Sequence, residues 1–217
     1  MSISENLTKI KNTLSSEVTL VAVSKTKPVT DLLEAYNAGQ RVFGENKIQE
    51  MASKWNEMPK DIEWHMIGHV QTNKVKYMAH FVSLIHAVDS IKLLKEINKQ
   101  ALKNNRIINC LIQVKIAEED SKFGMTETAL KTLLTSEEVQ SFQNTKIVGL
   151  MGMATFTDNK EQVSAEFQKL NTYYNELKET YDFDILSMGM SGDYQLAIEK
   201  ESTMIRVGSK IFGERNY

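Results

Sequence analysis

The chain has few of the residues that mark specialised classes of protein. Its 217 residues include two prolines and a single cysteine, Cys110, so neither an internal disulfide nor a cysteine-rich metal site can form. Lysine and arginine number 26 against 28 aspartates and glutamates, which gives a formal charge of −2. Such a balance produces no overall field for nucleic acid or an anionic membrane, so we expect neither as a partner.

Long apolar segments are lacking too. No hydrophobic run approaches the roughly 20 residues of a membrane-spanning helix, and residues 1–17 lack the apolar centre of a secretory signal. The composition, with 41% hydrophobic and 25% charged residues, is that of a globular protein. We expect a cytoplasmic protein whose residues 1–217 form one domain.

What the sequence does contain is a repeated alternation of short apolar runs and amphipathic segments. Runs such as Leu20-Val21-Ala22-Val23 are apolar at every position, which is typical of parallel strands covered on both faces. We predict strands at Thr19–Lys25, Arg41–Gly44, Glu63–Gly68, Val82–Val88, Asn109–Ile116, Lys146–Ala154, Ile185–Gly189 and Thr203–Phe212.

Helical periodicity fills the segments between these runs. Apolar residues from Val163 to Leu177 follow one another at spacings of four, three, four and three, which places them on one face of a helix. Further helices are predicted at Ser4–Leu14, from Leu32 to Gly39, after a cap at Ser90, behind Thr126, and briefly up to Glu199.

Eight strands that alternate with helices form either an open doubly wound sheet or a closed (β/α)8 barrel. Eight is the number of strands that closes with its interior filled by side chains. No G-x-G-x-x-G pattern follows a strand, which disfavours a dinucleotide-binding sheet. We therefore predict an α/β fold, a single TIM barrel with an extra N-terminal helix.

Candidate site residues lie where predicted strands seven and eight end, which is where barrels of this kind often bind phosphate. Ser191 follows strand seven near the start of a short helical pattern, where unpaired N–H groups favour an anion. Gly208 would let a phosphate approach the backbone of strand eight, and the Ser209 hydroxyl could donate to it. A simple helix cap and a turn glycine are the alternative interpretation.

A lysine closes the otherwise apolar first strand. Lys25 continues the side of the strand that carries Val21 and Val23, and lysine is rarely buried without a reason. A desolvated lysine loses its proton more easily, and the neutral amine can attack an aldehyde. The alternative is a lysine that simply reaches solvent at the end of a strand.

Other polar residues could line the same end of the barrel. Arg206 lies on the same side of strand eight as Gly208 and needs an acceptor, most commonly a carboxylate. Glu45 and Asn46 close strand two, and His65 falls on strand three, where a hydrogen-bonded core histidine is the alternative. The histidines show no metal-binding pair on a helix, so we predict no metal site.

Several separate segments carry a family resemblance. They are Val21–Pro28, Phe43–Asn46, Trp64–Lys74, Ser121–Gly124, Gly149–Met151, Leu186–Ser191 and Ser202–Gly213. Together they resemble the pyridoxal-phosphate homeostasis protein family (the YggS/PROSC family) over nearly the whole chain. The resemblance implies a barrel similar to the barrel domain of alanine racemase, which holds pyridoxal 5′-phosphate (PLP) as a Schiff base.

The resemblance also implies roles for individual residues. Matched by position, Lys25 would be the Schiff-base lysine and Arg206 would face the pyridine nitrogen. Further matched positions near the cofactor are Ser191, Gly208 and Ser209, which would hold the phosphate, together with Asn46 and His65.

Arg206 in that position bears on catalysis, because a fixed cation disfavours protonation of the ring nitrogen and weakens the ring as an electron sink. Related racemases also take a tyrosine acid/base from a second domain, which we do not expect after Tyr217. We therefore expect a monomeric, non-catalytic protein that buffers PLP or delivers it to apo PLP-dependent enzymes. Two alternatives stay open: a weak amino-acid racemase or decarboxylase, and a barrel enzyme acting on an unrelated phosphorylated metabolite.

Overall fold

The computed structural model describes residues 2–119 and 123–214, which form eight parallel strands. The strands are β1 (Thr19–Val23), β2 (Val42–Glu45), β3 (Glu63–Met66), β4 (Leu84–Val88), β5 (Ile108–Gln113), β6 (Thr145–Met151), β7 (Ile185–Met190) and β8 (Met204–Val207). They pair in chain order, and β8 pairs with β1, so the sheet closes on itself. The predicted closed barrel is confirmed.

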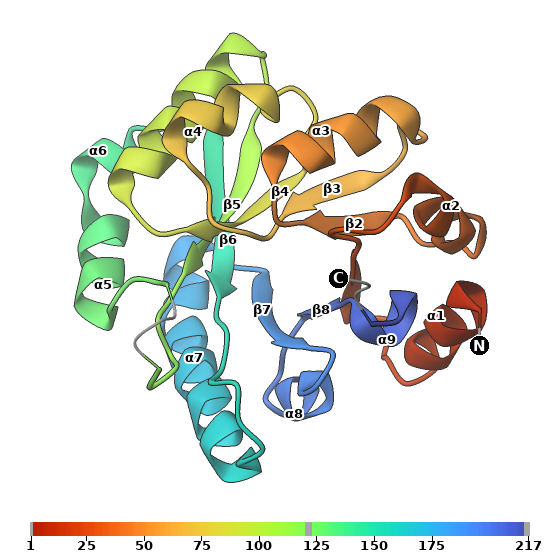
Figure 1. Cartoon of the computed structure of the whole chain (residues 1–217). Helices are drawn as coiled ribbons and strands as arrows, with labels where there is room; N and C mark the ends of the chain where they lie inside the picture. Colours follow the sequence, from red (N-terminus) through yellow and green to blue (C-terminus); the bar gives the residue numbers. More distant parts are fainter. Residues whose placement is uncertain (1, 120–122, 215–217) are drawn as a thin grey trace.

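Helices cover the outside of this barrel (Figure 1). They are α1 (Ile3–Lys11), α2 (Val29–Asn37), α3 (Ile48–Glu57), α4 (Ile91–Lys103), α5 (Glu127–Thr135), α6 (Glu137–Gln140), α7 (Lys160–Tyr181), α8 (Tyr194–Glu199), α9 (Ser209–Phe212) and the 3-10 helix η1 (Thr72–Tyr77). The predicted cap at Ser90 is confirmed, because its side chain accepts a backbone N–H bond at the start of α4. The side chain of Thr126 caps α5 in the same way.

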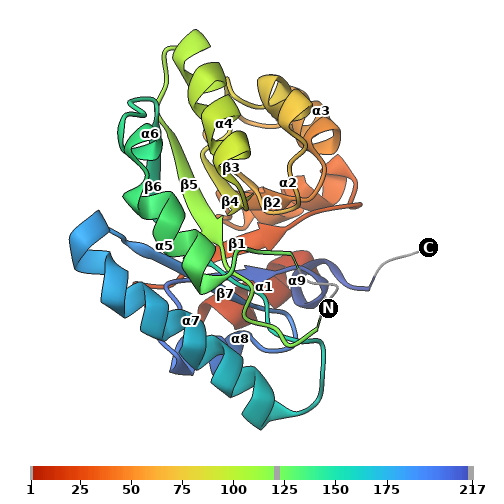
Figure 2. The ribbon, with the colours of Figure 1, turned by 90° about the vertical axis from the view of Figure 1, so that its left-hand side faces the viewer.

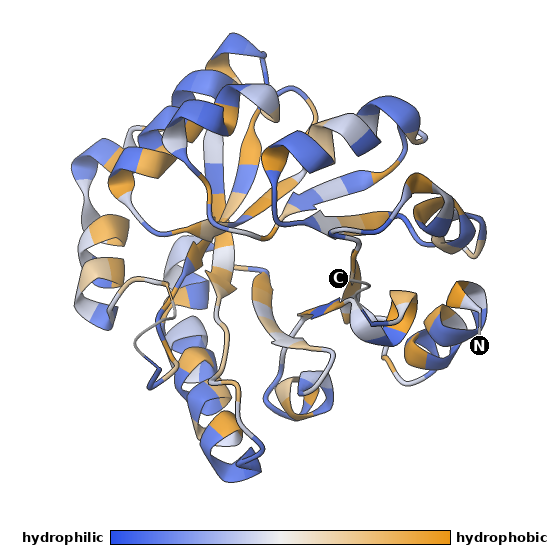
Figure 3. Cartoon of the chain, in the orientation of Figure 1, coloured by the Kyte–Doolittle hydropathy of each residue, from blue (hydrophilic) through white to orange (hydrophobic). Residues whose placement is uncertain are grey.

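Two apolar layers hold the strands in place. Val21, Leu111 and Met204 belong to a cluster that fills the barrel interior. Large side chains such as Trp64 and Phe167 belong to the second cluster, between the strands and the helices. Helices accordingly carry both hydrophobic and hydrophilic residues (Figure 3). Inward positions that are polar must therefore find partners inside the barrel.

The prediction for the last strand is wrong in its extent. β8 ends at Val207, and Ser209–Phe212 form the short helix α9 instead of continuing the strand. The carbonyl oxygen of Gly208 accepts the N–H groups of Ile211 and Phe212, both at 2.9 Å. The apolar pair Ile211 and Phe212 is buried from this helix, so the run that suggested a strand is core-facing without being extended.

The N-terminal helix lies beside the short helix that follows β8. α1 packs against α9 and α2, and the side-chain amide of Asn6 donates to the carbonyl oxygen of Ile211 at 3.1 Å. Figures 1 and 2 show α1 beside α9 from both directions. Among the described residues, no helix combines the length and the apolar character that crossing a bilayer requires.

Candidate functional site

The carboxyl ends of all the strands lie at one end of the parallel barrel. In the β1–β8 pair, Ala22 lies opposite Val207, and the next residue, Gly208, lies against Val23. A Cβ atom on Gly208 would be 3.1 Å from the Val23 carbonyl oxygen. Lys25, which is half-buried, follows Val23 by two residues. The structure thus brings Lys25 and Gly208 to the same end of neighbouring strands.

Ser191 and Gly208 are joined directly. The backbone N–H of Gly208 donates to Ser191 Oγ at 3.1 Å, which ties the end of β7 to the end of β8. Since this oxygen accepts from Gly208, the Ser191 hydroxyl proton points elsewhere and can be donated to another acceptor. Ser209 is exposed and begins α9. The three predicted phosphate-binding residues therefore form one cluster.

The helix start expected near Ser191 is confirmed, and Ser191 lies just before it. The first helical residue of α8 is Tyr194, and Asp193 is its N-cap. Asp193 Oδ1 accepts the N–H of Met190 at 2.5 Å, which closes a tight turn around Ser191. Ser191 therefore lies in the turn that precedes the helix, and its hydroxyl meets the end of β8 instead of capping α8.

Arg206 extends inside the barrel and is 4% exposed. Its Nη1 donates to Ser187 Oγ at 2.6 Å and its Nη2 to the Gly152 carbonyl oxygen at 3.0 Å. The expected carboxylate acceptor is therefore wrong for these two bonds. Burial lowers the pKa of Arg206 to about 10, with the charge of Asp193 acting in the opposite direction, so the guanidinium remains charged at neutral pH.

Two histidines continue the hydrogen bonds of Arg206. Ser187 Oγ lies 3.2 Å from His86 Nδ1, and His86 Nε2 lies 3.1 Å from His65 Nδ1. Because the guanidinium can only donate, Ser187 Oγ accepts from Arg206, and the buried hydrogen bonds continue from Ser187 through His86 to His65. Burial lowers the pKa of His65 to about 3 and that of His86 well below its usual value, so both rings are neutral.

Glu45, the last residue of β2, and Asn46, which follows it, have different surroundings in the structure. Glu45 was expected to line the mouth, and that is wrong: it is fully buried on the side of α3. There its Oε1 accepts from Ser24 Oγ and Lys54 Nζ, both at 2.7 Å. Asn46 is half-buried at the carboxyl end of the barrel, and its carbonyl oxygen would lie 2.5 Å from a Cβ atom on Gly68.

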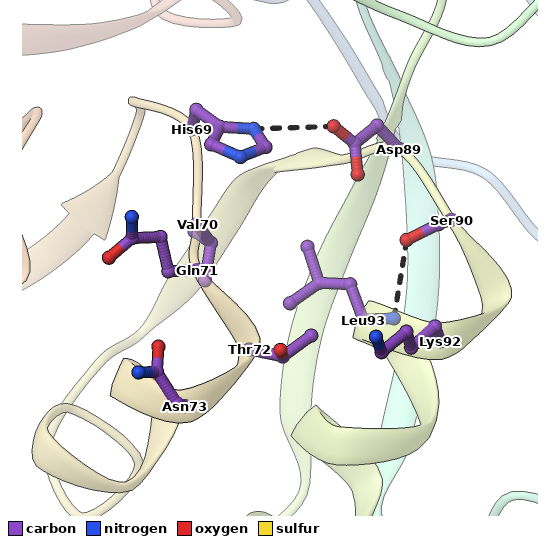
Figure 4. A pocket seen from close by; sticks show the side chains of 9 residues that line it. All are labelled: His69, Val70, Gln71, Thr72, Asn73, Asp89, Ser90, Lys92 and Leu93. Carbon is purple, nitrogen blue, oxygen red and sulfur yellow. Dashed lines mark hydrogen bonds and ion pairs between the residues drawn. The ribbon is translucent and has the colours of Figure 1, made fainter.

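A polar hollow of about 360 Å³ opens at the same end, beyond β3 and β4. Figure 4 shows that its walls come from the segment His69–Asn73 and from the start of α4. His69 Nδ1 lies 3.3 Å from Asp89 Oδ2, and Phe123 stacks on the His69 ring. In the described part of the chain, no group of three or more potential ligands is arranged to hold a metal ion.

Three residues were not expected from the sequence: Ser187, His86 and Lys54. Ser187 and His86 occupy inward positions on apolar strands, where a polar residue needs a buried partner, and that pattern could have pointed to them. Lys54 carried no such signal, because one lysine on an amphipathic helix is usually solvated.

The chain matches known proteins over nearly its whole length. Residues 1–216 match the model of the family described as alanine racemase, N-terminal domain. The pyridoxal phosphate homeostasis protein of Aquifex aeolicus is 42% identical over 201 residues, which cover 91% of this chain and 87% of that protein.

Two solved structures of PipY from Synechococcus elongatus, one without PLP and one with PLP bound, are also similar. Each is 34% identical and covers 98% of this chain and 100% of its own, with TM-scores of 0.92 and 0.89. Fold and sequence together define a barrel of the alanine racemase N-terminal class. Within that class, the chain belongs to the pyridoxal phosphate homeostasis protein family.

Proposed function

We propose that the protein binds PLP reversibly at the carboxyl end of the barrel, with Lys25 as its covalent attachment point. We further propose that it serves PLP homeostasis by buffering the cofactor or delivering it to apo-enzymes. The observation that carries the proposal is that Lys25, the Ser191–Gly208 pair and Arg206 lie at the ends of β1, β7 and β8, which are neighbours because the barrel is closed.

These residues fit the chemical parts of PLP. Bound PLP supplies an aldehyde, which a primary amine captures as a Schiff base with loss of one water molecule. Lys25 offers that amine, and the uncharged form of its Nζ is the nucleophile. Ser191 can donate its hydroxyl proton to a phosphate oxygen, and Gly208 lets the phosphate approach because it has no side chain. Ser209 adds a second hydroxyl from the start of α9.

The charge and the surroundings of Arg206 favour a PLP carrier over a PLP-dependent enzyme. Its guanidinium is held by Ser187 and Gly152 and stays charged at neutral pH. A cation fixed beside the pyridine nitrogen opposes its protonation, and the unprotonated ring stabilises a substrate carbanion less well. His65 and His86 are neutral and hydrogen-bonded to each other, which makes them poor proton acceptors.

The proposal is tested by titrating PLP-free protein with PLP, recording the visible absorbance, and then adding an apo form of a PLP-dependent enzyme. We expect an absorbance band from the Schiff base that is absent in Lys25→Ala, and activation of the apo-enzyme as PLP is released. The relative with PLP bound motivates this experiment.

The same samples separate the carrier from a catalyst. Incubation with single amino acids should leave their chirality and carboxyl groups intact over many equivalents. Racemisation or decarboxylation that is lost in Lys25→Ala would overturn the carrier and establish a weak PLP-dependent enzyme instead. The absence of any Schiff-base band would exclude covalent attachment of PLP at Lys25.

A further inference from the structure

The residue after Lys25 has a strained backbone. Thr26 adopts φ 65°, in the left-handed region that is costly for a β-branched residue. Such strain is costly and persists only where surrounding contacts enforce it. Thr26 lies three residues after the end of β1 and directly after Lys25, so the contacts that enforce its conformation also set the direction of Lys25.

A buried ionic cluster supplies those contacts. Lys54 of α3 is 7% exposed in its side chain, and its Nζ lies 2.7 Å from Glu45 Oε1 and 2.7 Å from Glu50 Oε1. The same Nζ donates to the Ser24 carbonyl oxygen at 2.8 Å. Lys54 and Glu45 are buried and Glu50 is partly exposed. Burying charged groups costs free energy unless they are paired, so core packing alone does not account for this arrangement.

The cluster grips the backbone on both sides of Lys25. Before Lys25, Ser24 is held through its carbonyl by Lys54 and through its hydroxyl by Glu45. After Lys25, the backbone N–H of Thr26 donates to Glu50 Oε1 at 2.6 Å. Lys25 is therefore the one residue of this turn whose two neighbours are both anchored to the same ionic cluster.

The cluster does not face the site itself. Glu45 and Lys54 lie between the barrel and α3, whereas Ser191, Gly208 and Arg206 lie at the mouth and inside the barrel. A change in the cluster should consequently alter the orientation of Lys25 while leaving the phosphate-binding residues in place.

We propose that Glu50 and Lys54 are positioning residues, which hold the strained turn at Thr26 and thereby aim the amine of Lys25 at the aldehyde of PLP. This inference rests on the proposed function. It predicts that loosening the turn slows Schiff-base formation, because a nucleophile that is displaced by about 1 Å loses much of its rate.

The test mixes PLP with PLP-free protein and follows the absorbance of the Schiff base with time. Glu50→Ala removes the acceptor of the Thr26 N–H, and we expect formation to slow about tenfold. Glu50→Gln keeps an oxygen acceptor at that position and should restore most of the rate. Glu57→Ala, at an exposed glutamate of the same helix, is the matched control and should behave as wild type.

A second variant separates positioning from support of the fold. Glycine adopts positive φ without strain but also reaches many other conformations, so Thr26→Gly should unfold at a similar temperature while loosening the turn, and should form the Schiff base more slowly. Affinity for pyridoxine 5′-phosphate, which has the phosphate but no aldehyde, should be unchanged in Glu50→Ala and Thr26→Gly.

The possible failures are distinct. If wild type forms no Schiff base, the proposed function fails and the inference falls with it. If wild type forms one and Lys25→Ala does not, but both variants form it at the wild-type rate, the positioning role alone is wrong. It is equally wrong if the variants lose pyridoxine 5′-phosphate affinity in proportion to the rate, since the cluster would then support the whole site.

Discussion

Ser191 and Gly208 meet through one hydrogen bond, although 17 residues separate them along the chain. Ser191→Ala deletes both that acceptor and the hydroxyl that we propose donates to the phosphate. We expect PLP affinity to fall by about 1–2 kcal/mol, the scale of a charge-assisted hydrogen bond. Equilibrium titration measures this directly, with Ser53→Ala, at an exposed serine of α3, as the control. Wild-type affinity in Ser191→Ala would exclude Ser191 from the site.

His65 makes stability depend on pH. The folded pKa is about 3 against an ordinary value of 6.5, so between these values the unfolded chain binds more protons. The stabilisation is therefore complete above pH 6.5 and is lost as the pH falls toward 3. The slope reaches at most about 1.4 kcal/mol per pH unit for one such group.

Urea unfolding between pH 6.5 and 5 checks this dependence. His65→Gln keeps a hydrogen-bonding partner for His86 Nε2 but cannot titrate, so its unfolding free energy should fall less steeply over that range. His80→Gln, at an exposed histidine, should keep the wild-type slope. Equal slopes in wild type and His65→Gln would show that His65 is not buried as a neutral group.

At the scale of elements, the approach of β6 to β7 depends on Gly149. A Cβ atom there would be 1.8 Å from the carbonyl oxygen of Ile185, which belongs to the neighbouring strand. Gly149→Ala should therefore force the strands apart and lower the unfolding free energy by about 3 kcal/mol or more. Denaturant titration gives the value.

Gly192, which lies just beyond the end of β7, provides the contrast. Nothing lies within 4 Å of a Cβ atom placed on it, so Gly192→Ala should leave the unfolding free energy nearly unchanged. Equal stability losses in the two variants would contradict the close approach of β6 and β7.

The elements also show what the sequence could and could not predict. Apolar runs located every strand, because strands covered on both faces are apolar at consecutive positions. The same rule failed at Ile211 and Phe212, since apolar residues mark burial but not backbone conformation. Glu45 was expected at the mouth because it closes a strand. That expectation failed because the end of a strand does not show which face a side chain occupies.

For the whole molecule, closure of the barrel is the feature that assembles the site. Lys25 and Ser209 lie near opposite ends of the sequence, and only the pairing of β1 with β8 brings their strands together. The sequence predicted closure of the barrel from the number of strands and from the candidate site residues at the ends of the first, seventh and eighth strands. The buried series of hydrogen bonds from Arg206 to His65 depends on the directions of side chains on β3, β4, β7 and β8, which one sequence does not reveal.

The location of the covalent link tests the proposed binding of PLP at Lys25 most directly. Protein loaded with PLP is reduced with borohydride, which converts a Schiff base into a stable amine, then digested and analysed by mass spectrometry. We expect a pyridoxyl phosphate adduct on Lys25 and its absence in Lys25→Ala. An adduct confined to another lysine, or no adduct in loaded wild-type protein, would contradict attachment at Lys25.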